Sequence, residues 1–338
     1  MRASIGLTAR RALAVLAGSG ALLALALVAA PLIGPRPVDL RLALSGSGSP
    51  DHDILFGARL PRTLFAALTG ALLAASGVSF QAVLRNPLAS PFTLGVSGGA
   101  ALGAVLALRL GWDRALGGLP AVPMAAFAGA LAVVGVVGGL ARGRRRLSPV
   151  TLLLAGVMVN FICSALILVV HYQADLTQSF LMVRWTMGAL DLFGYEPLVT
   201  ALPLAALGLG LLLPTLRHLN VLSVGDDWAR SRGTDVRRVT ARQYFGASLL
   251  TASVVAHTGP IGFVGLVVPH TLRLLVGADH RVLFPASLLA GGAFLVACDT
   301  LARTILAPVE LPVGVITALL GGPFFLWLLL TRRREVFF

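Results

Sequence analysis

Long apolar runs separated by shorter polar connections make up almost the whole chain. The runs are about 20 residues long, the length of helix that crosses a hydrocarbon core of about 30 Å. Lipid requires backbone groups to be satisfied within each segment, which favours helices, and the ten-residue alternation of an outer-membrane barrel is absent. We therefore predict one all-α integral membrane domain over residues 1–338. Its ten transmembrane helices are expected at about 12–34, 61–83, 92–110, 119–140, 149–171, 194–216, 240–258, 260–276, 284–307 and 311–331.

Three connections are longer than the others. Residues 35–60 form an outer loop rich in Gly, Ser and Pro. Residues 172–193 form a second outer segment, in which we expect a short helix at the membrane interface with Trp185 at headgroup level. Residues 217–239 form the longest inner connection.

Composition excludes a soluble protein. Hydrophobic residues make up 57% of the 338 residues and charged residues 12%, and the mean hydropathy is +0.88, whereas a soluble domain carries about a quarter charged residues. All 27 basic residues are arginine and the net charge is +13. With the predicted spans, 19 of these arginines collect on one side of the membrane. The positive-inside rule makes that side cytoplasmic, with both termini on it, so the basic excess is an orientation signal and not a nucleic-acid footprint.

The first apolar run has a second interpretation. Arg10 and Arg11, followed by a run that ends in Ala29-Ala30-Pro31, also suit a cleaved signal peptide. Removing this run would leave an odd number of spans and misplace the other arginine clusters, so we expect a first transmembrane helix here.

Sequence patterns for catalysis, cofactors and metals are missing. The chain has no GxxxxGK[ST] motif and no lysine to serve one, and it has no HExxH or comparable cluster. Cys163 and Cys298 both fall inside predicted spans, so neither a disulfide framework nor a cysteine metal site is implied. We expect no catalytic, cofactor-binding or metal-binding residue.

The inner connection has the charge order of a short helix. Two acids stand where the helix would begin, two arginines where it would end, and a glycine follows at the C′ position. These residues are Asp226, Asp227, Arg230, Arg232 and Gly233. Thr234 is then expected to cap a second short helix over Asp235 to Arg238. An ordinary charged loop that obeys the positive-inside rule is the alternative.

Glycine and proline placement predicts close packing. Gly95, Gly99 and Gly103 recur every four residues, so they share one helix face and allow a neighbouring helix to approach. Residues 259–270 begin with Gly259-Pro260 and contain a second proline, so this segment is expected to be locally unwound, which is tolerated where backbone is buried in protein or lines a cavity. Packing and a role in a transport pathway are both open for these glycines.

Asp299 is the one acid that we place well inside a span. A lone carboxylate at mid-bilayer costs on the order of 2.5–3.5 kcal/mol. Arg303 lies at i+4 and nearer the outer end, so we expect the two to neutralise each other and to extend outward. A proton relay is the alternative, but it usually needs several acids along one pathway.

Arg59 and Arg62 flank a proline where the second span begins on the outer side. At i and i+3 they are expected to point the same way and to present two positive charges to the outside. Anchoring in lipid headgroups and docking of an acidic partner both fit this spacing.

From about residue 55 to 331 the chain resembles the permease subunits of type II ABC importers for iron-siderophore, haem and cobalamin, the FecCD family. The motifs that carry this resemblance are RLPR (59–62), QAVLRNPLASPFTLGVSGGAALG (81–103), GPIGFVGLVVPHTLRLLVGADHR (259–281) and ARTILAPVELPVGVITALLGGPFFLWLL (302–329). The resemblance implies ten helices in a permease subunit and a second permease subunit, identical or paralogous, around one pathway. It also implies two cytoplasmic ATP-binding subunits and an extracytoplasmic substrate-binding protein.

The resemblance assigns docking and coupling residues. Arg59, Arg62 and Arg303 match positions where family members meet acidic residues of the binding protein. The segment 220–238 matches the coupling helices that sit in a cleft of the ATPase. In this segment the matched residues are Gly225, Asp226, Asp227, Ala229, Arg230 and Gly233.

The resemblance also assigns a cytoplasmic gate. Asn86 and Leu88, in the turn after the second span, match gate residues of the family. A second gate element, often small hydroxyl residues before the fifth span, reads Pro149-Val150 here, which departs from the family pattern.

The resulting hypothesis is a transport subunit that catalyses no reaction itself. The resemblance implies a multi-pass permease in a bacterial cytoplasmic membrane, in contact with lipid, which imports an iron-siderophore, haem or cobalamin-type chelate. A secondary transporter driven by an ion gradient is the alternative, although it would need more ionisable groups inside the bundle than Asp299. A membrane-embedded enzyme would need clustered acids, histidines or a nucleophile inside the spans.

Overall fold

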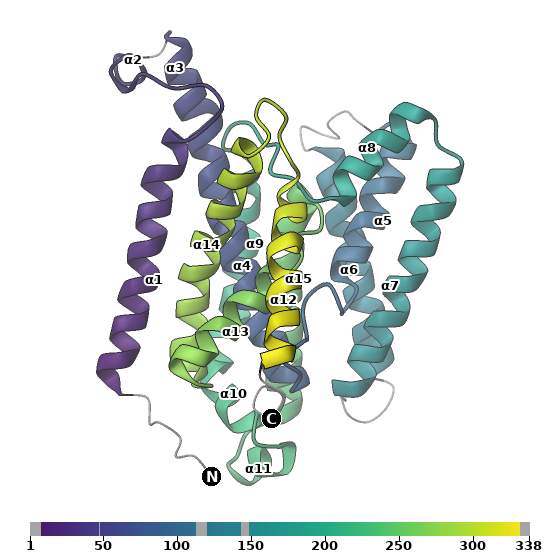
Figure 1. Cartoon of the computed structure of the whole chain (residues 1–338). Coiled ribbons are helices and arrows are strands. Elements are labelled where there is room, and N and C mark those ends of the chain that lie inside the picture. Colours follow the sequence, from purple (N-terminus) through teal and green to yellow (C-terminus); the bar gives the residue numbers. More distant parts are fainter. Residues whose placement is uncertain (1–7, 47, 113–119, 143–148, 332–338) are drawn as a thin grey trace.

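The computed structural model describes residues 8–46, 48–112, 120–142 and 149–331, which form a bundle of helices without strands (Figure 1). Helices α10 (Leu216–Leu222) and α11 (Asp226–Ser231) lie at one end of the bundle, which we call the α11 end. The other end carries α8 (Leu176–Thr186) and is called the α8 end. Of the arginines assigned to the cytoplasm, Arg2, Arg144 to Arg146 and Arg332 to Arg334 lie outside the described residues.

A helix lies in each of the ten predicted ranges. These helices are α1 (Ala9–Ala29), α4 (Leu60–Leu84), α5 (Val96–Arg109), α6 (Ala121–Arg142), α7 (Pro149–Tyr172), α9 (Glu196–Leu212), α12 (Val236–Thr258), α13 (Val264–Val276), α14 (His280–Thr304) and α15 (Val313–Thr331). In the described part of the chain, the helical segments that contain α1, α4, α6, α7, α9 and α14 are long and apolar enough to cross a membrane. Helices α5 and α13 have 14 and 13 residues, which at about 1.5 Å per residue is shorter than a hydrocarbon core.

The expected outer loop at 35–60 is partly helical. It contains the short helices α2 (Leu40–Leu44) and α3 (Pro50–His52), followed by a π-helical stretch, η2 (Asp53–Arg59), that runs directly into α4. The wider π-helical turn accommodates an extra residue without interrupting the helix. Short 3₁₀ turns continue α1 over Ala30–Leu32 and α9 over Leu213–Thr215.

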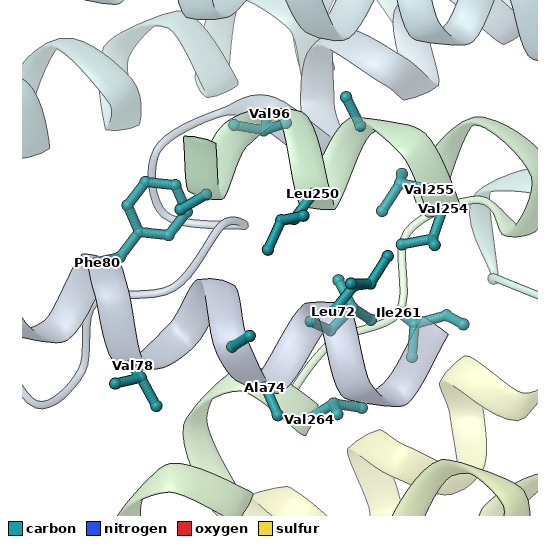
Figure 2. Packing of buried hydrophobic residues seen from close by; sticks show 14 of the residues in the cluster. Leu72, Ala74, Val78, Phe80, Val96, Leu250, Val254, Val255, Ile261 and Val264 are labelled. Carbon is teal, nitrogen blue, oxygen red and sulfur yellow. The ribbon is translucent and has the colours of Figure 1, made fainter. Parts of the chain in front are cut away.

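Helix α4 is the centre of the bundle and is buried along most of its length. Apolar side chains of α4, among them Leu72 and Phe80, meet Leu250 and Val254 of α12 in a continuous core (Figure 2). Helices α13 and α14 pack on α4 as well. Gly77 allows one of these contacts, because a Cβ added there would fall on the backbone of Gly265 in α13.

The predicted glycine face is confirmed for two of its three residues. Gly99 and Gly103 of α5 face α6, where an added Cβ would collide with the carbonyl oxygens of Gly129 and Ala125. Gly95 instead precedes α5 in a left-handed conformation, with φ of 79°, which glycine adopts without steric cost. These glycines therefore serve helix packing and a turn.

The predicted unwound segment is present. Helix α12 ends at Thr258 and α13 begins at Val264, and both Gly259 and Phe263 between them have positive φ. The segment packs on the end of α8, since a Cβ at Gly259 would meet the carbonyl oxygen of Trp185. The interface helix is found as α8, and its Trp185 is half-buried and packs on the core. Its position at headgroup level stays a prediction.

Candidate functional site

A buried ion cluster lies at the α8 end, and it differs from the expected pair. Asp299 accepts from Arg62 through Nε at 3.1 Å and Nη2 at 2.9 Å, a forked geometry that only arginine provides. The expected partner, Arg303, is further away, with Nε at 3.9 Å from Oδ2. The two carboxylate-binding arginines come from α4 and α14, so Asp299 is neutralised across two helices and does not extend outward.

The predicted docking arginines are turned into the protein. Arg62 uses its remaining edge for Glu310, with Nη1 to Oε2 at 2.7 Å. Arg303 is buried and donates to the carbonyl oxygen of Ala30. Arg59 is also buried and donates to the backbone carbonyl oxygens of Pro31 and Arg36. In this chain, therefore, the expectation that Arg59 and Arg62 present their charges to the outside is wrong, because backbone oxygens and carboxylates satisfy them internally.

A charged cavity of about 430 Å³ opens beside this cluster. Arg59, Arg62 and Arg303 form part of its wall, so the structure brings all three together. The wall also contains Arg36 and Arg184, whose side chains are exposed. Sequence reasoning missed these two, because each stands alone in an outer connection and no periodic pattern links it to the other three.

At the opposite end of the bundle, α11 has the predicted boundaries. It begins with Asp226 and Asp227 after Gly225, whose φ of 148° suits only glycine. Gly233 follows the helix with φ of 76°, as predicted for its C′ position. Arg230 pairs with Asp227 within the helix at 3.5 Å.

The predicted second short helix is wrong. Asp235 and not Thr234 is the N-cap, since its side chain accepts from the Arg238 amide at 3.0 Å. The Thr234 hydroxyl is buried and lies 3.3 Å from Nδ1 of His218, so it contacts this histidine and does not cap a helix. The helix that Asp235 caps is α12, which runs without a break into the bundle core. The segment therefore consists of α10, α11 and the first turns of α12.

The exposed tip of α11 is partly apolar. Trp228 is 50% exposed and carries the guanidinium of Arg232 over its ring at 4.9 Å. Val224, just before the helix, is also exposed, whereas Ala229 on the other side is fully buried and holds α11 against the bundle. An exposed aromatic ring beside arginine is typical of an anchor at a protein interface. Trp228 was not among the predicted residues, although an aromatic side chain in a charged loop was a visible signal.

The predicted gate residues lie on two elements. Asn86 Oδ1 accepts from the Leu88 amide at 2.9 Å, which closes a tight turn after α4. Leu88 is exposed at the tip of this turn. Pro149 begins α7, and Val150 in its first turn is also exposed. These exposed apolar side chains are available to another surface.

The described residues do not contain a cluster of metal ligands. No group of three or more His, Cys, Asp or Glu side chains there could hold a metal ion. The ion cluster at Asp299 is instead saturated by arginines, which bind carboxylates and repel cations.

Comparison with known proteins shows which family has this architecture. A family model described as the FecCD transport family matches residues 14–331. The chain belongs to the FecCD transport family. This FecCD chain is 42% identical over 284 residues to the hemin transport system permease protein HmuU of Yersinia pestis, covering 82% of this chain and 83% of that protein. It is 45% identical over 280 residues to the cobalamin import system permease protein BtuC of Halobacterium salinarum, covering 82% and 73%.

A solved structure supports the same placement of the FecCD chain. That structure is described as an inward-facing conformation of a metal-chelate type ABC transporter, and it superposes with a TM-score of 0.83 at 30% identity. The match covers 93% of this chain and 98% of the other. The all-α fold of an ABC importer permease is therefore confirmed, and the protein is a multi-pass membrane protein.

Proposed function

We propose that the chain is the permease subunit of an ATP-driven importer for a metal chelate of the iron-siderophore, haem or cobalamin kind. The observation that carries the proposal is the family match. The matched residues include those that line the charged cavity and those that form α11. The α11 end faces the cytoplasm, with two ATP-binding subunits on it, and the α8 end faces the binding protein. The membrane is the bacterial cytoplasmic membrane.

In this mechanism the chain itself breaks no bond. Two ATP-binding subunits hold α11 in a cleft and change its position when they bind and hydrolyse ATP. Helix α12 follows α11 directly and packs on α4, α6 and α9, so a displacement of α11 reaches the bundle core. A second permease subunit completes the pathway, with the turn at Leu88 and the first turn of α7 at its cytoplasmic gate.

The experiment that tests this function is uptake into vesicles. The chain is co-expressed with its genomic neighbours, purified as a complex and reconstituted, and uptake of haemin, cobalamin and ferric citrate is measured with and without ATP. We expect uptake of one of these chelates to require ATP and the co-purified ATP-binding subunit. Uptake driven by a proton or sodium gradient alone would contradict the proposal and support a secondary transporter.

Trp228 is expected to anchor the ATP-binding subunit. Trp228→Ala should weaken association of the ATP-binding subunit with the permease about thirtyfold or more, because truncation of an aromatic anchor costs about 2 kcal/mol or more. The measurement is a titration of detergent-solubilised permease with the ATP-binding subunit. Trp112→Ala is the matched control, since Trp112 is 47% exposed but follows α5, whose last residue, Arg109, donates to Gln178 of α8. Equal affinities of the two variants for the ATP-binding subunit would show that Trp228 is not part of the interface.

Docking of the binding protein is best tested at the exposed cations of the cavity. Reversal of Arg62 would bury like charges beside Asp299. Arg36 and Arg184 are exposed, and the pair that Arg184 forms with Asp191 lies in solvent, so water screens the like charges that its reversal creates. The double variant Arg36→Glu/Arg184→Glu is expected to weaken association with the co-purifying binding protein, and more so at low salt, because exposed charges are screened by ions.

Arg41→Glu is the control for this docking experiment. Arg41 is exposed on α2 but does not line the cavity. An equal loss of affinity in this control would indicate a general charge effect. Unchanged affinity of the double variant at low salt would contradict docking at the cavity.

A further inference from the structure

Arg85 joins the end of a transmembrane helix to the segment that carries α11. It is the C-cap of α4, and its backbone is left-handed with φ of 46° and ψ of 38°. Its Nε donates to the carbonyl oxygen of Leu222, the last residue of α10, at 3.0 Å. Its Nη2 pairs with the carboxylate of Asp226, the first residue of α11. One guanidinium thus holds both sides of the α10–α11 connection.

The backbone at Arg85 is unusual and needs an explanation. A left-handed conformation costs about 1–2 kcal/mol in a residue other than glycine or asparagine. Together with Phe263, Arg85 is one of two non-glycine residues with positive φ in the described part of the chain. Such strain persists where the surroundings fix it and is concentrated at functional positions. A glycine would adopt this conformation without strain, but it would lack the two contacts that the Arg85 side chain makes.

The residues that follow Arg85 form the candidate gate. Asn86 is next in the chain, and its side chain fixes the amide of Leu88. Pro87 between them has a restricted φ, so the turn from Arg85 to Leu88 is short and stiff. A displacement of Arg85 therefore moves the exposed Leu88 side chain with it.

The other side of α10 is held to a different part of the bundle. Asn220 of α10 donates to Asp279 at 2.7 Å and accepts from the amide of His280 at 2.9 Å. Asp279 is the N-cap of α14 and His280 is its first residue. By contrast, the Arg230–Asp227 and Arg232–Trp228 contacts of α11 stay within its own segment. Of the ion pairs found in the described ranges, Arg85–Asp226 is the one that connects α11 to a transmembrane helix.

We propose that Arg85 is a positioning residue that transmits the movement of α11 to the Asn86–Leu88 turn. This inference rests on the proposed permease function and adds a specific physical link to it. Movement of α11 pulls on Asp226, Asp226 pulls on the guanidinium, and the guanidinium moves the end of α4. Arginine is required because its planar fork serves the Leu222 carbonyl and the Asp226 carboxylate at once, which a lysine ammonium on a flexible stem does less well.

A double-mutant cycle tests the link. Arg85→Gln, Asp226→Asn and the double variant are reconstituted with the ATP-binding subunits, and uptake of the transported chelate is divided by ATP hydrolysed. Each single variant is expected to lower this ratio about fivefold or more while ATP hydrolysis persists. The uptake ratio of the double variant should be no lower than that of the single variants, because both substitutions remove the same Arg85–Asp226 contact. Additive losses, or a normal ratio in Arg85→Gln, would overturn the proposal.

A distance measurement separates positioning from folding. Leu88→Cys is spin-labelled in the assembled complex, and the distance between labels of the two permease subunits is measured before and after ATP is added. We expect an ATP-dependent change in the Leu88→Cys protein that is lost when Arg85→Gln is added and is partly restored by Arg85→Lys. A change that persists with Arg85→Gln would contradict the link, whatever the stability of the variant.

Two controls keep the outcome specific. Arg281→Gln removes an exposed arginine from the first turn of α14, at the same end of the bundle but outside the segment 220–238. It should leave the uptake ratio and the distance change unaltered, and a loss equal to that of Arg85→Gln would show a general effect of charge. The protein with native Arg85 must show ATP-dependent uptake. If it does not, the proposed function fails; if it does and Arg85→Gln behaves identically, only the link fails.

Discussion

Replacing Asp299 by alanine is expected to destabilise the protein by about 3–5 kcal/mol, because removal of one partner leaves buried charges uncompensated. The carboxylate is 2% exposed and lies between the buried guanidinium groups of Arg62 and Arg303. Without it, two like charges face each other in the bundle. Reversible unfolding in bicelles, followed by a steric-trap assay, measures the difference from the unsubstituted protein.

Glu310→Ala is the matched control for this prediction. Glu310 also pairs with Arg62, at 2.7 Å, but its side chain is 39% exposed. Water replaces an exposed partner, so the expected cost is about 0–1 kcal/mol. Equal costs for the two variants would show that Asp299 is reached by water and that the cluster is not buried in the folded protein.

Gly77→Ala is expected to be the second strongly destabilising change, at about 1–3 kcal/mol for overpacking. The new Cβ would fall on the carbonyl oxygen of Gly265, which is backbone and cannot rotate away. Helices α4 and α13 would have to separate, and α4 also packs on α12 and α14. The measurement is the yield of monodisperse protein together with its thermal midpoint in detergent.

Gly135→Ala is the control that shows whether the loss of stability depends on the position or follows from any glycine-to-alanine change in a helix. Gly135 lies in α6, and no atom of another described helix comes within 4 Å of an added Cβ. Alanine there should be neutral or stabilise by about 0.5–1 kcal/mol, since glycine is the poorer helix former. Gly77→Ala is therefore predicted to lower the stability of the protein, whereas Gly135→Ala is predicted not to lower it. A thermal midpoint for Gly77→Ala at or above that of Gly135→Ala would contradict the close α4–α13 contact.

The helices could be predicted from the sequence because their cause is local. Apolar runs of membrane length, the acids at the start of α11 and the glycine after it act within a few residues. The small-residue face at Gly99 and Gly103 was predictable for the same reason. The N-cap of α12 was misplaced by one residue, from Asp235 to Thr234, because the alternative use of the Thr234 hydroxyl depends on His218, 16 residues away.

The candidate sites were less predictable because their cause is tertiary. An i,i+4 spacing suggested Arg303 for Asp299, but Arg62 lies 237 residues away along the chain and makes the shorter contacts. Likewise, the inward orientation of Arg59 depends on carbonyl oxygens of the connection before it. The resemblance named Asn86 and Leu88, and only the contacts of the neighbouring Arg85 show what holds them to α11.

The distance along the chain between Arg62 and Asp299 has a consequence for biosynthesis. At about 5–20 residues per second, roughly 10–50 s pass between synthesis of α4 and synthesis of its partner carboxylate. During this time Arg62, in the first turn of α4, reaches the headgroup region by extending its long side chain. The ion pair closes only once α14 has been inserted, so until then the guanidinium of Arg62 has neither of its two carboxylate partners, Asp299 and Glu310.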